Sequence, residues 1–194
     1  DLSAEPVIIS VPDMDKGRYW ILHTMDMGHY TTSMIGSRTH GTKGGHFMFA
    51  SRSWKGETPA SVTEVIRVDS DILKVMGRIM ATSKDDEKVA LGYMDDWNVR
   101  TLSAYLGQPG PKATEHQWPD PASTNWLQRV NFVLCQGDMG TADKHWLAQY
   151  KETGLAPCNT KLSAAQMAAA KQGEKQGLAY LNALLPKMTS SEGD

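Results

Sequence analysis

Short apolar runs alternate with glycine-rich turns between Pro6 and Trp54, and this alternation constrains the fold more than any other feature of the chain. The first run, Val7–Val11, is followed by Pro12 and a turn-rich segment, which is typical of a β-hairpin. Further strands are predicted at 18–30, 31–39, 46–50, 62–68 and 72–80. No crossover helix fits between strands this closely spaced, so the sequence predicts an antiparallel β-sandwich or barrel.

The second half of the chain has helical patterns instead. A helix is predicted over 85–97, with Ser83 or Asp85 as its N-cap, and a proline-rich connection follows it. Three more helices are expected, the first capped by Thr124 and the last capped by Ser163. The predicted class is mainly β with C-terminal α, arranged as a β core at 1–82, a helix and connection at 83–122, a helical segment at 123–186 and a linker or tail at 187–194.

Charge and hydropathy exclude two classes of partner. The formal net charge of the 194 residues is −2, and the basic residues are scattered rather than gathered on one face or stripe. Nucleic acid is therefore not an expected partner. The strongest apolar stretch, Val7–Val11, has only the length of a strand, so no membrane-spanning segment is expected either.

The two cysteines, Cys135 and Cys158, leave two interpretations open. A bridge between them would stabilise the fold by about 3 kcal/mol on the loop-entropy model. Two buried thiols are the favoured interpretation, because the spacing matches no metal-binding pattern and a single pair says little about the redox compartment.

Four histidines fall on neighbouring predicted strands: His23, His29, His40 and His46. In a curled sheet three of them could converge on one ion. The sequence lacks the pair of histidines one residue apart, with a carboxylate soon after, that metal-binding jelly rolls of the cupin type carry. Structural roles are therefore favoured for the histidines, and no metal or cofactor is predicted.

Asp26 stands within an apolar strand pattern, where a carboxylate is costly to bury without a partner. Arg38, one predicted strand later, could be that partner. Such a pair would be structural or would mark a polar pocket that accepts a ligand. Trp54 could line such a pocket, although aromatic side chains in strands more often belong to a core.

Several segments of the chain resemble the bacterial family catalogued as domain of unknown function 1254. The resemblance covers about eighty residues and rests on Pro6–Pro12, Gly17–Trp20, Asp26, Ile35–Gly41, Trp54–Gly56 and Gly77–Ile79. It continues into Leu102–Tyr105, the helix from Asn125 and Leu155–Pro157. The chain departs from the family pattern at Ser51–Trp54 and at His40 and His46, so the resemblance does not imply the histidine cluster.

The resemblance implies a jelly-roll-like β-sandwich, frequent export to the bacterial periplasm and no agreed activity. Members of this family usually carry a second β domain, catalogued as domain of unknown function 1214, which this sequence lacks. The chain is therefore expected to be a central piece of a longer protein or a shortened homologue. Asp26, Arg38 and Arg78 match polar positions of the family pattern, and none of them carries a known role.

We expect a non-catalytic ligand-binding or assembly module from a larger two-domain protein. Its expected partners are a second β domain, another copy of the chain, or a small molecule or glycan. The predicted ligand-binding residues are Asp26, Arg38, His40 and Trp54, and no catalytic residue is assigned. The alternative is a hydrolase- or lyase-type enzyme that acts on a small molecule or glycan, with Asp26 as acid or base and with possible metal assistance. Whether the chain is an enzyme stays open.

Overall fold

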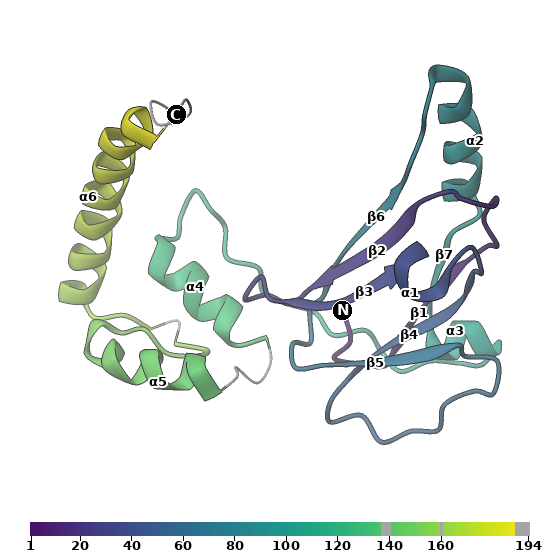
Figure 1. The fold of residues 1–194 in the computed structure, drawn as a ribbon. Coiled ribbons are helices and arrows are strands. Elements are labelled where there is room, and N and C mark those ends of the chain that lie inside the picture. Colours follow the sequence, from purple (N-terminus) through teal and green to yellow (C-terminus); the bar gives the residue numbers. More distant parts are fainter. Residues whose placement is uncertain (137–140, 160, 189–194) are drawn as a thin grey trace. The chain divides into compact units, whose positions relative to one another are not determined.

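The computed structural model describes residues 1–136, 141–159 and 161–188, and these residues form two compact units (Figure 1). The β unit contains residues 1–115 together with Gln136, and the helical unit contains residues 116–135 and the described residues from 141 on. Most of the tail predicted at 187–194 lies outside the described residues. Among the described helices, none combines the length and the apolarity that a bilayer crossing requires.

The β unit contains two sheets. One has the strand order β5-β4-β1-β7 and the other has the order β3-β2-β6. The strands are β1 (Val7–Val11), β2 (Trp20–Met25), β3 (Thr31–Gly36), β4 (Gly45–Ser51), β5 (Glu64–Val68), β6 (Lys74–Ile79) and β7 (Asn98–Thr101). The mainly β class expected for this half of the chain is therefore confirmed.

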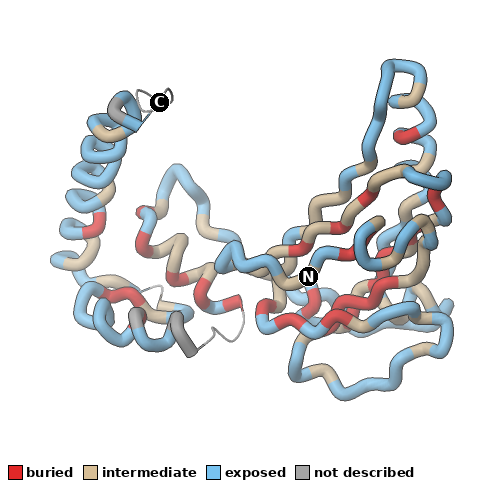
Figure 2. Tube along the Cα trace, in the orientation of Figure 1, coloured by how far each residue is buried: buried red, intermediate tan, exposed pale blue. Residues whose placement is uncertain are grey.

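One hydrophobic core lies between the two sheets, because every second side chain of the central strands points inward. Trp20, Leu22 and Thr24 of β2 are buried, whereas the residues between them are partly exposed. Phe47 and Phe49 of β4 are buried in the same cluster of apolar side chains. The buried positions accordingly concentrate on the central strands (Figure 2).

The pairing of the strands differs from the antiparallel prediction at one place. β5 runs parallel to β4, with Phe47 opposite Glu64 and Ser51 opposite Val68. A parallel pair needs a connection long enough to return the chain to the same end of the sheet. Residues 52–63 provide that connection without forming a helix. The absence of a helical pattern between the strands therefore did not exclude a parallel pair.

Two further elements were not expected from the sequence. β3 ends at Gly36, and Ser37–His40 form the short helix α1 where a strand was predicted. The Ser37 hydroxyl accepts a hydrogen bond from the Trp20 backbone N–H (2.8 Å) and donates one to the Arg18 carbonyl (3.0 Å), so the chain turns away from the sheet there. All four residues of β7 are exposed, so β7 lacks the alternation of buried and exposed residues that marks a half-buried strand.

The helix predicted over 85–97 is present as α2 (Lys84–Asp95). Ser83 is its N-cap, and the Ser83 hydroxyl accepts a hydrogen bond from the Asp86 backbone N–H (3.1 Å). Tyr93 of α2 and Trp97 beyond it pack against the core of the β unit. The Trp97 ring lies directly over Gly77 of β6, a position where any Cβ would collide with it.

The helical unit contains α4 (Trp126–Leu134), α5 (Thr141–Gln149), the single 3₁₀ turn η1 (Lys151–Thr153) and α6 (Ala164–Met188), while the short α3 (Leu102–Leu106) belongs to the β unit. Asn125 caps α4 in place of the expected Thr124, and it shares a reciprocal capping box with Gln128. Asn131 of α4 is buried and holds the segment between η1 and α6. Its side-chain amide donates hydrogen bonds to the carbonyls of Gly154 (2.9 Å) and Asn159 (2.8 Å).

Cys135 and Cys158 form a disulfide, so the favoured interpretation of two buried thiols is wrong. The bridge joins the end of α4 to the loop after η1, and Asn131 holds the same loop, because its carbonyl accepts a hydrogen bond from the Cys158 backbone N–H (3.1 Å). The two cysteines are 23 residues apart in sequence. Sequence spacing could not show that the fold brings their Cα atoms within 4.7 Å.

Replacing both cysteines by serine is expected to lower the free energy of unfolding of the helical unit by about 3 kcal/mol, because the unfolded chain regains the entropy of an open loop. Urea titration with hydrogen exchange read by mass spectrometry on peptides from each unit measures this. The reduced wild-type protein should behave like the double variant. Equal urea midpoints for the oxidised wild type and the variant would contradict the prediction.

Gly77→Ala is expected to destabilise the β unit by about 1–3 kcal/mol, because the new methyl group overpacks the space that the Trp97 ring fills. Gly92→Ala is the matched control, since no atom lies within contact distance of a Cβ at that helical position. Thermal unfolding of both variants compares them directly. A second variant that joins Gly77→Ala to Trp97→Leu should recover part of the loss.

Candidate functional site

Asp26 closes the turn between β2 and β3 and does not pair with Arg38. Its Oδ1 accepts a hydrogen bond from the Tyr30 backbone N–H (2.9 Å), and its own backbone N–H donates to the Tyr30 carbonyl (3.1 Å). His29 within the turn adopts a left-handed conformation with φ of 65°. The carboxylate is partly exposed at the end of the strand rather than buried inside it. The feature that suggested a buried ion pair is therefore a turn-closing residue.

Arg38 lies in α1 at the opposite end of β3, about 20 Å along the strand from the turn that holds Asp26. Its side chain is exposed, and no ion pair joins it to Asp26 among the residues that the structure describes. His40 ends the same short helix. Its Nε2 lies 3.1 Å from Glu64 Oε2, and its ring meets Phe47 edge-on at a centroid distance of 5.0 Å.

Trp54 lies in the connection between β4 and β5. The Arg67 guanidinium lies over its ring, 5.0 Å from the centroid, and Arg67 Nη1 donates to the Trp54 carbonyl (2.6 Å). Among the residues that the structure describes, no hydrogen bond, ion pair or ring contact joins Trp54 to Asp26, Arg38 or His40. Asp26, His40 and Trp54 therefore make separate structural contacts, and Arg38 is exposed. Within the described residues, no contact brings the four predicted ligand-binding residues together.

The predicted histidines are also distributed. His46 Nδ1 lies 2.8 Å from Ser10 Oγ, and His23 Nε2 lies 2.9 Å from Thr31 Oγ1. Within residues 1–136, 141–159 and 161–188, His, Cys, Asp and Glu side chains form no group of three or more that could hold a metal ion.

The densest charged cluster of the β unit surrounds Arg18, just before β2. Arg18 Nη2 donates to Asp86 Oδ1 of α2 (2.6 Å), and Nη1 donates to the Met80 carbonyl at the end of β6 (2.9 Å). A longer contact of 3.4 Å reaches Asp15 Oδ2, and the guanidinium lies over the Tyr93 ring at 5.5 Å. Only 10% of the Arg18 side chain is exposed. Arg18 thus joins the loop before β2, the end of β6 and the start of α2.

The charges in this cluster stabilise one another. The hydrogen bond from Arg18, assisted by the Thr82 backbone N–H (2.9 Å), holds the pKa of Asp86 well below its usual value. The same bond raises the pKa of Arg18. Hydrogen bonding to Asp15 raises the pKa of the Tyr93 phenol. The pair of Arg18 and Asp86 is therefore ionised at neutral pH, whereas the Tyr93 phenol keeps its proton.

Two buried N–H groups near this cluster have no hydrogen-bond partner among the described residues: Arg18 Nε and Trp97 Nε1. A buried donor without an acceptor costs about 1–3 kcal/mol. The Arg18 guanidinium lies over the Tyr93 ring. Trp97 and Tyr93 both pack against the core of the β unit. Arg18 is therefore ion-paired with Asp86, while its Nε–H and the Trp97 Nε1–H have no acceptor among the described residues.

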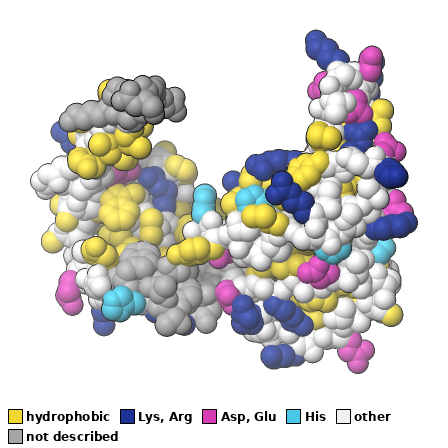
Figure 3. Space-filling model, in the orientation of Figure 1, with side chains coloured by type: hydrophobic (Ala, Val, Ile, Leu, Met, Phe, Trp, Pro, Cys, Tyr) yellow, Lys and Arg dark blue, Asp and Glu magenta, His cyan; other side chains and the backbone are white. Residues whose placement is uncertain are grey.

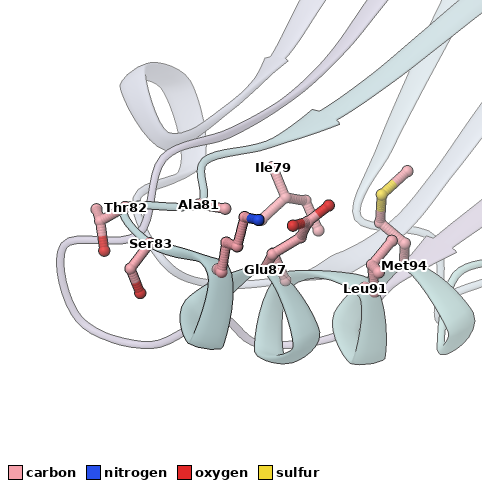
Figure 4. Close-up of a pocket in the computed structure, with 9 residues that line it drawn as sticks. Ile79, Ala81, Thr82, Ser83, Glu87, Leu91 and Met94 are labelled. Atoms are coloured by element: carbon pink, nitrogen blue, oxygen red, sulfur yellow. The ribbon is translucent and has the colours of Figure 1, made fainter.

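A cavity of about 470 Å³ lies between α2 and the end of β6 (Figure 4). Glu87, Leu91 and Met94 extend from the helix toward the side where Ile79 lies on the strand. Lys84 adds an ammonium group to the lining. The lining is mixed apolar and charged, which suits contact with a ligand or a partner.

A second cavity of about 420 Å³ lies within the helical unit. The aromatic rings of Trp126 and Tyr150 and the side chain of Leu155 line it, together with small residues of α6. Trp126 Nε1 donates to the Ala170 carbonyl (3.0 Å), which fixes that ring against α6. No histidine or cysteine of the described residues lines either cavity.

Sequence reasoning missed the Arg18 cluster, although two signals for it are present. Ser83 and Asp86 have the spacing of a capping box, and Arg18 belongs to one of the segments on which the family resemblance rests. The Asp86 carboxylate, however, bonds to Thr82 and Arg18 and not to the Ser83 backbone. Its pairing with a residue far away in sequence could be seen only in the folded chain.

Residues 1–100 match the family model described as "Protein of unknown function (DUF1254)". The chain belongs to this family. No curated protein matches it. It is similar to the crystal structure of the VPA0106 protein from Vibrio parahaemolyticus, with 62% sequence identity and a TM-score of 0.86. That similarity covers 97% of this chain and 47% of the VPA0106 chain, so the DUF1254 chain spans less than half the length of this relative.

Asp86→Asn is expected to reduce stability near neutral pH and to have a smaller effect in acid. Because folding lowers the pKa of Asp86, its contribution is fully present above the ordinary value of 3.8 and is lost as the pH falls through the lower folded pKa. Denaturant unfolding at pH 7 and at about pH 3 measures the difference between variant and wild type.

Asp85→Asn is the control for this prediction, because Asp85 also lies in the first turn of α2 but does not contact Arg18. It should leave the pH dependence unchanged. A difference between Asp86→Asn and wild type that stays constant from pH 7 into acid would contradict the assigned role.

Proposed function

We propose that this DUF1254 chain is a non-catalytic assembly module of a longer protein. In this proposal a jelly-roll-like β-sandwich provides the folded core, and α6 is an arm that docks a further β domain of the same polypeptide. The observation that carries the proposal is an apolar row on α6, formed by Leu178, Leu181 and Leu185, in which each side chain is more than half exposed.

The spacing of this row is that of one helix face. Positions three and four residues apart lie above one another on an α-helix, so the three leucines form a continuous stripe. They are 57%, 52% and 55% exposed, respectively. Residues 175–183 of α6 are all exposed, as the burial colours on this helix show (Figure 2). Burying a leucine side chain contributes about 1.5–3 kcal/mol, so covering the row would stabilise an interface considerably.

The length of the relative supports a further domain as the occupant of this row. The VPA0106 chain is more than twice as long as the region that matches, so it contains room for another folded unit. The jelly-roll-like arrangement is supported by the two sheets that share one core, although β4 and β5 are parallel. We also propose that the protein works in an oxidising compartment such as the periplasm, supported by the disulfide between Cys135 and Cys158.

The chemistry of the described residues favours assembly over the enzymatic alternative. Asp26, the acid or base of that alternative, uses its Oδ1 to close a turn. Arg18 and Asp86 form an ion pair that connects three elements of the β unit. A small molecule or glycan remains a possible ligand of the proposed module, with the cavity beside α2 as the place for it.

The docking role of α6 is tested by joining this chain, in one polypeptide, to the part of the VPA0106 protein that it does not match. Amides of 178–188 are expected to exchange at least tenfold more slowly in the joined protein than in the 194-residue chain, because a packed helix face opens less often. Leu181→Asp should remove that protection. Ala183→Asp, on the opposite face of α6, is the matched control and should preserve it.

Equal exchange of 178–188 in the short and the joined protein would contradict docking of a further domain. Light scattering after size-exclusion chromatography adds the second measurement. The 194-residue chain is expected to be monomeric at micromolar concentration, and a dimer dissociated by Leu181→Asp would identify another copy of the chain as the occupant instead.

A further inference from the structure

Thioether and imidazole groups gather on the outer face of the three-stranded sheet. Because alternate residues of a strand share a face, His23 and Met25 of β2 point away from the core that Trp20, Leu22 and Thr24 fill. Met34 of β3 and Met76 of β6 stand opposite His23 in the ladder and share its face. Hydrophobic, histidine and basic side chains lie together on this part of the surface (Figure 3).

The strand register places three of these side chains in a single row. His23 pairs directly with Met34 on one side and with Met76 on the other. Directly opposite residues of antiparallel strands have Cβ atoms about 4.5–5.5 Å apart. Methionine has three rotatable bonds, so both sulfur atoms can reach an ion held by the central imidazole. Met25, two residues further along β2, is the diagonal neighbour of the row.

The His23 ring is already oriented by a neighbour. Its Nε2 lies 2.9 Å from the Thr31 hydroxyl oxygen. In the tautomer in which Nε2 donates to Thr31, Nδ1 carries the lone pair that a metal ion needs. Histidines that bind metals are usually held in this way by a hydrogen bond through the other ring nitrogen.

We infer that His23, Met34 and Met76 form a binding site for a soft monovalent metal ion, Cu(I) or Ag(I). Thioether sulfur is a soft ligand that selects Cu(I), and imidazole also suits copper. Zn²⁺ is not favoured, because its usual protein ligands are thiolate, imidazole and carboxylate rather than thioether. The outer face of the sheet thus combines thioether and imidazole ligands in one row.

The charges around the row also favour a monovalent ion. Lys74 and Arg78 flank Met76 on β6 and are exposed. Arg78 Nη2 lies 3.9 Å from Met76 Sδ. A bound cation has to displace Arg78 from the sulfur and is repelled by both basic groups, and this cost rises with the charge of the ion. Arg78→Gln is therefore expected to tighten binding.

The sequence of β2 and its turn adds further donors of the same kind. His23, Met25, Met27 and His29 alternate with other residues along the chain, and the last two lie in the turn after β2. His29 is exposed. Thioether and imidazole groups thus continue along the chain beyond the row.

The test measures binding of Ag(I) by calorimetry, and of Cu(I) without oxygen in competition with a coloured chelator. One ion per chain is expected. Met34→Leu and Met76→Leu should each weaken binding by about tenfold or more, by analogy with the loss of groups that support a metal site. Met94→Leu, which removes an exposed methionine of α2, is the matched control and should bind as the wild type does. Zn²⁺ should not compete.

Leucine keeps the apolar character of the face, so the same variants separate metal binding from protein docking. A face used only for protein contact would tolerate Met34→Leu and Met76→Leu and would bind neither ion. Absence of Ag(I) and Cu(I) binding at micromolar concentration, or binding that is equal in wild type and both leucine variants, overturns the inference. Circular dichroism of each variant establishes that it is folded.

Discussion

The contact between Trp20 and Phe47 is the interaction on which the β unit depends. Both side chains are fully buried, one on each sheet, with ring centroids 6.2 Å apart. Trp20 Nε1 donates to the Gly41 carbonyl (3.0 Å), so the buried ring also fixes the turn after α1. The hydrophobic contact therefore sets the distance between the sheets, and the polar edge of the same ring sets the path of the chain around them.

The polar contacts of the β unit then close this core at its edges. Arg18 connects the loop before β2 with the end of β6 and the start of α2, and Trp97 fills the space over Gly77. The ion pair of Arg18 with Asp86 thus holds these elements together. Large apolar side chains stay exposed on the outer face of the three-stranded sheet, such as Met34, and in the apolar row on α6.

The elements of the fold were predictable where the pattern is local and strong. β1, β2 and α2 follow from an apolar run, an alternating run and a capped helical stripe. β7 was missed because all four of its residues are exposed, and α1 was missed because hydrogen bonds of Ser37 to residues of another segment end the strand. The candidate site was less predictable than the fold, since Asp26 lies before β3 and Arg38 lies after it, so the strand separates the two expected partners.

The sequence by itself determined that this protein has a β half and a helical half, and it identified the family of unknown function to which the chain belongs. Apolar spacing and turn residues contain this information, because the secondary structure of each segment depends largely on residues close to it in the sequence. Only the tertiary structure decided the disulfide, the parallel pairing of β4 with β5, the ion pair of Arg18 with Asp86, and the row of Met34, His23 and Met76. Each of these joins residues far apart in the chain, and such contacts depend on strand register and packing, which no local pattern specifies.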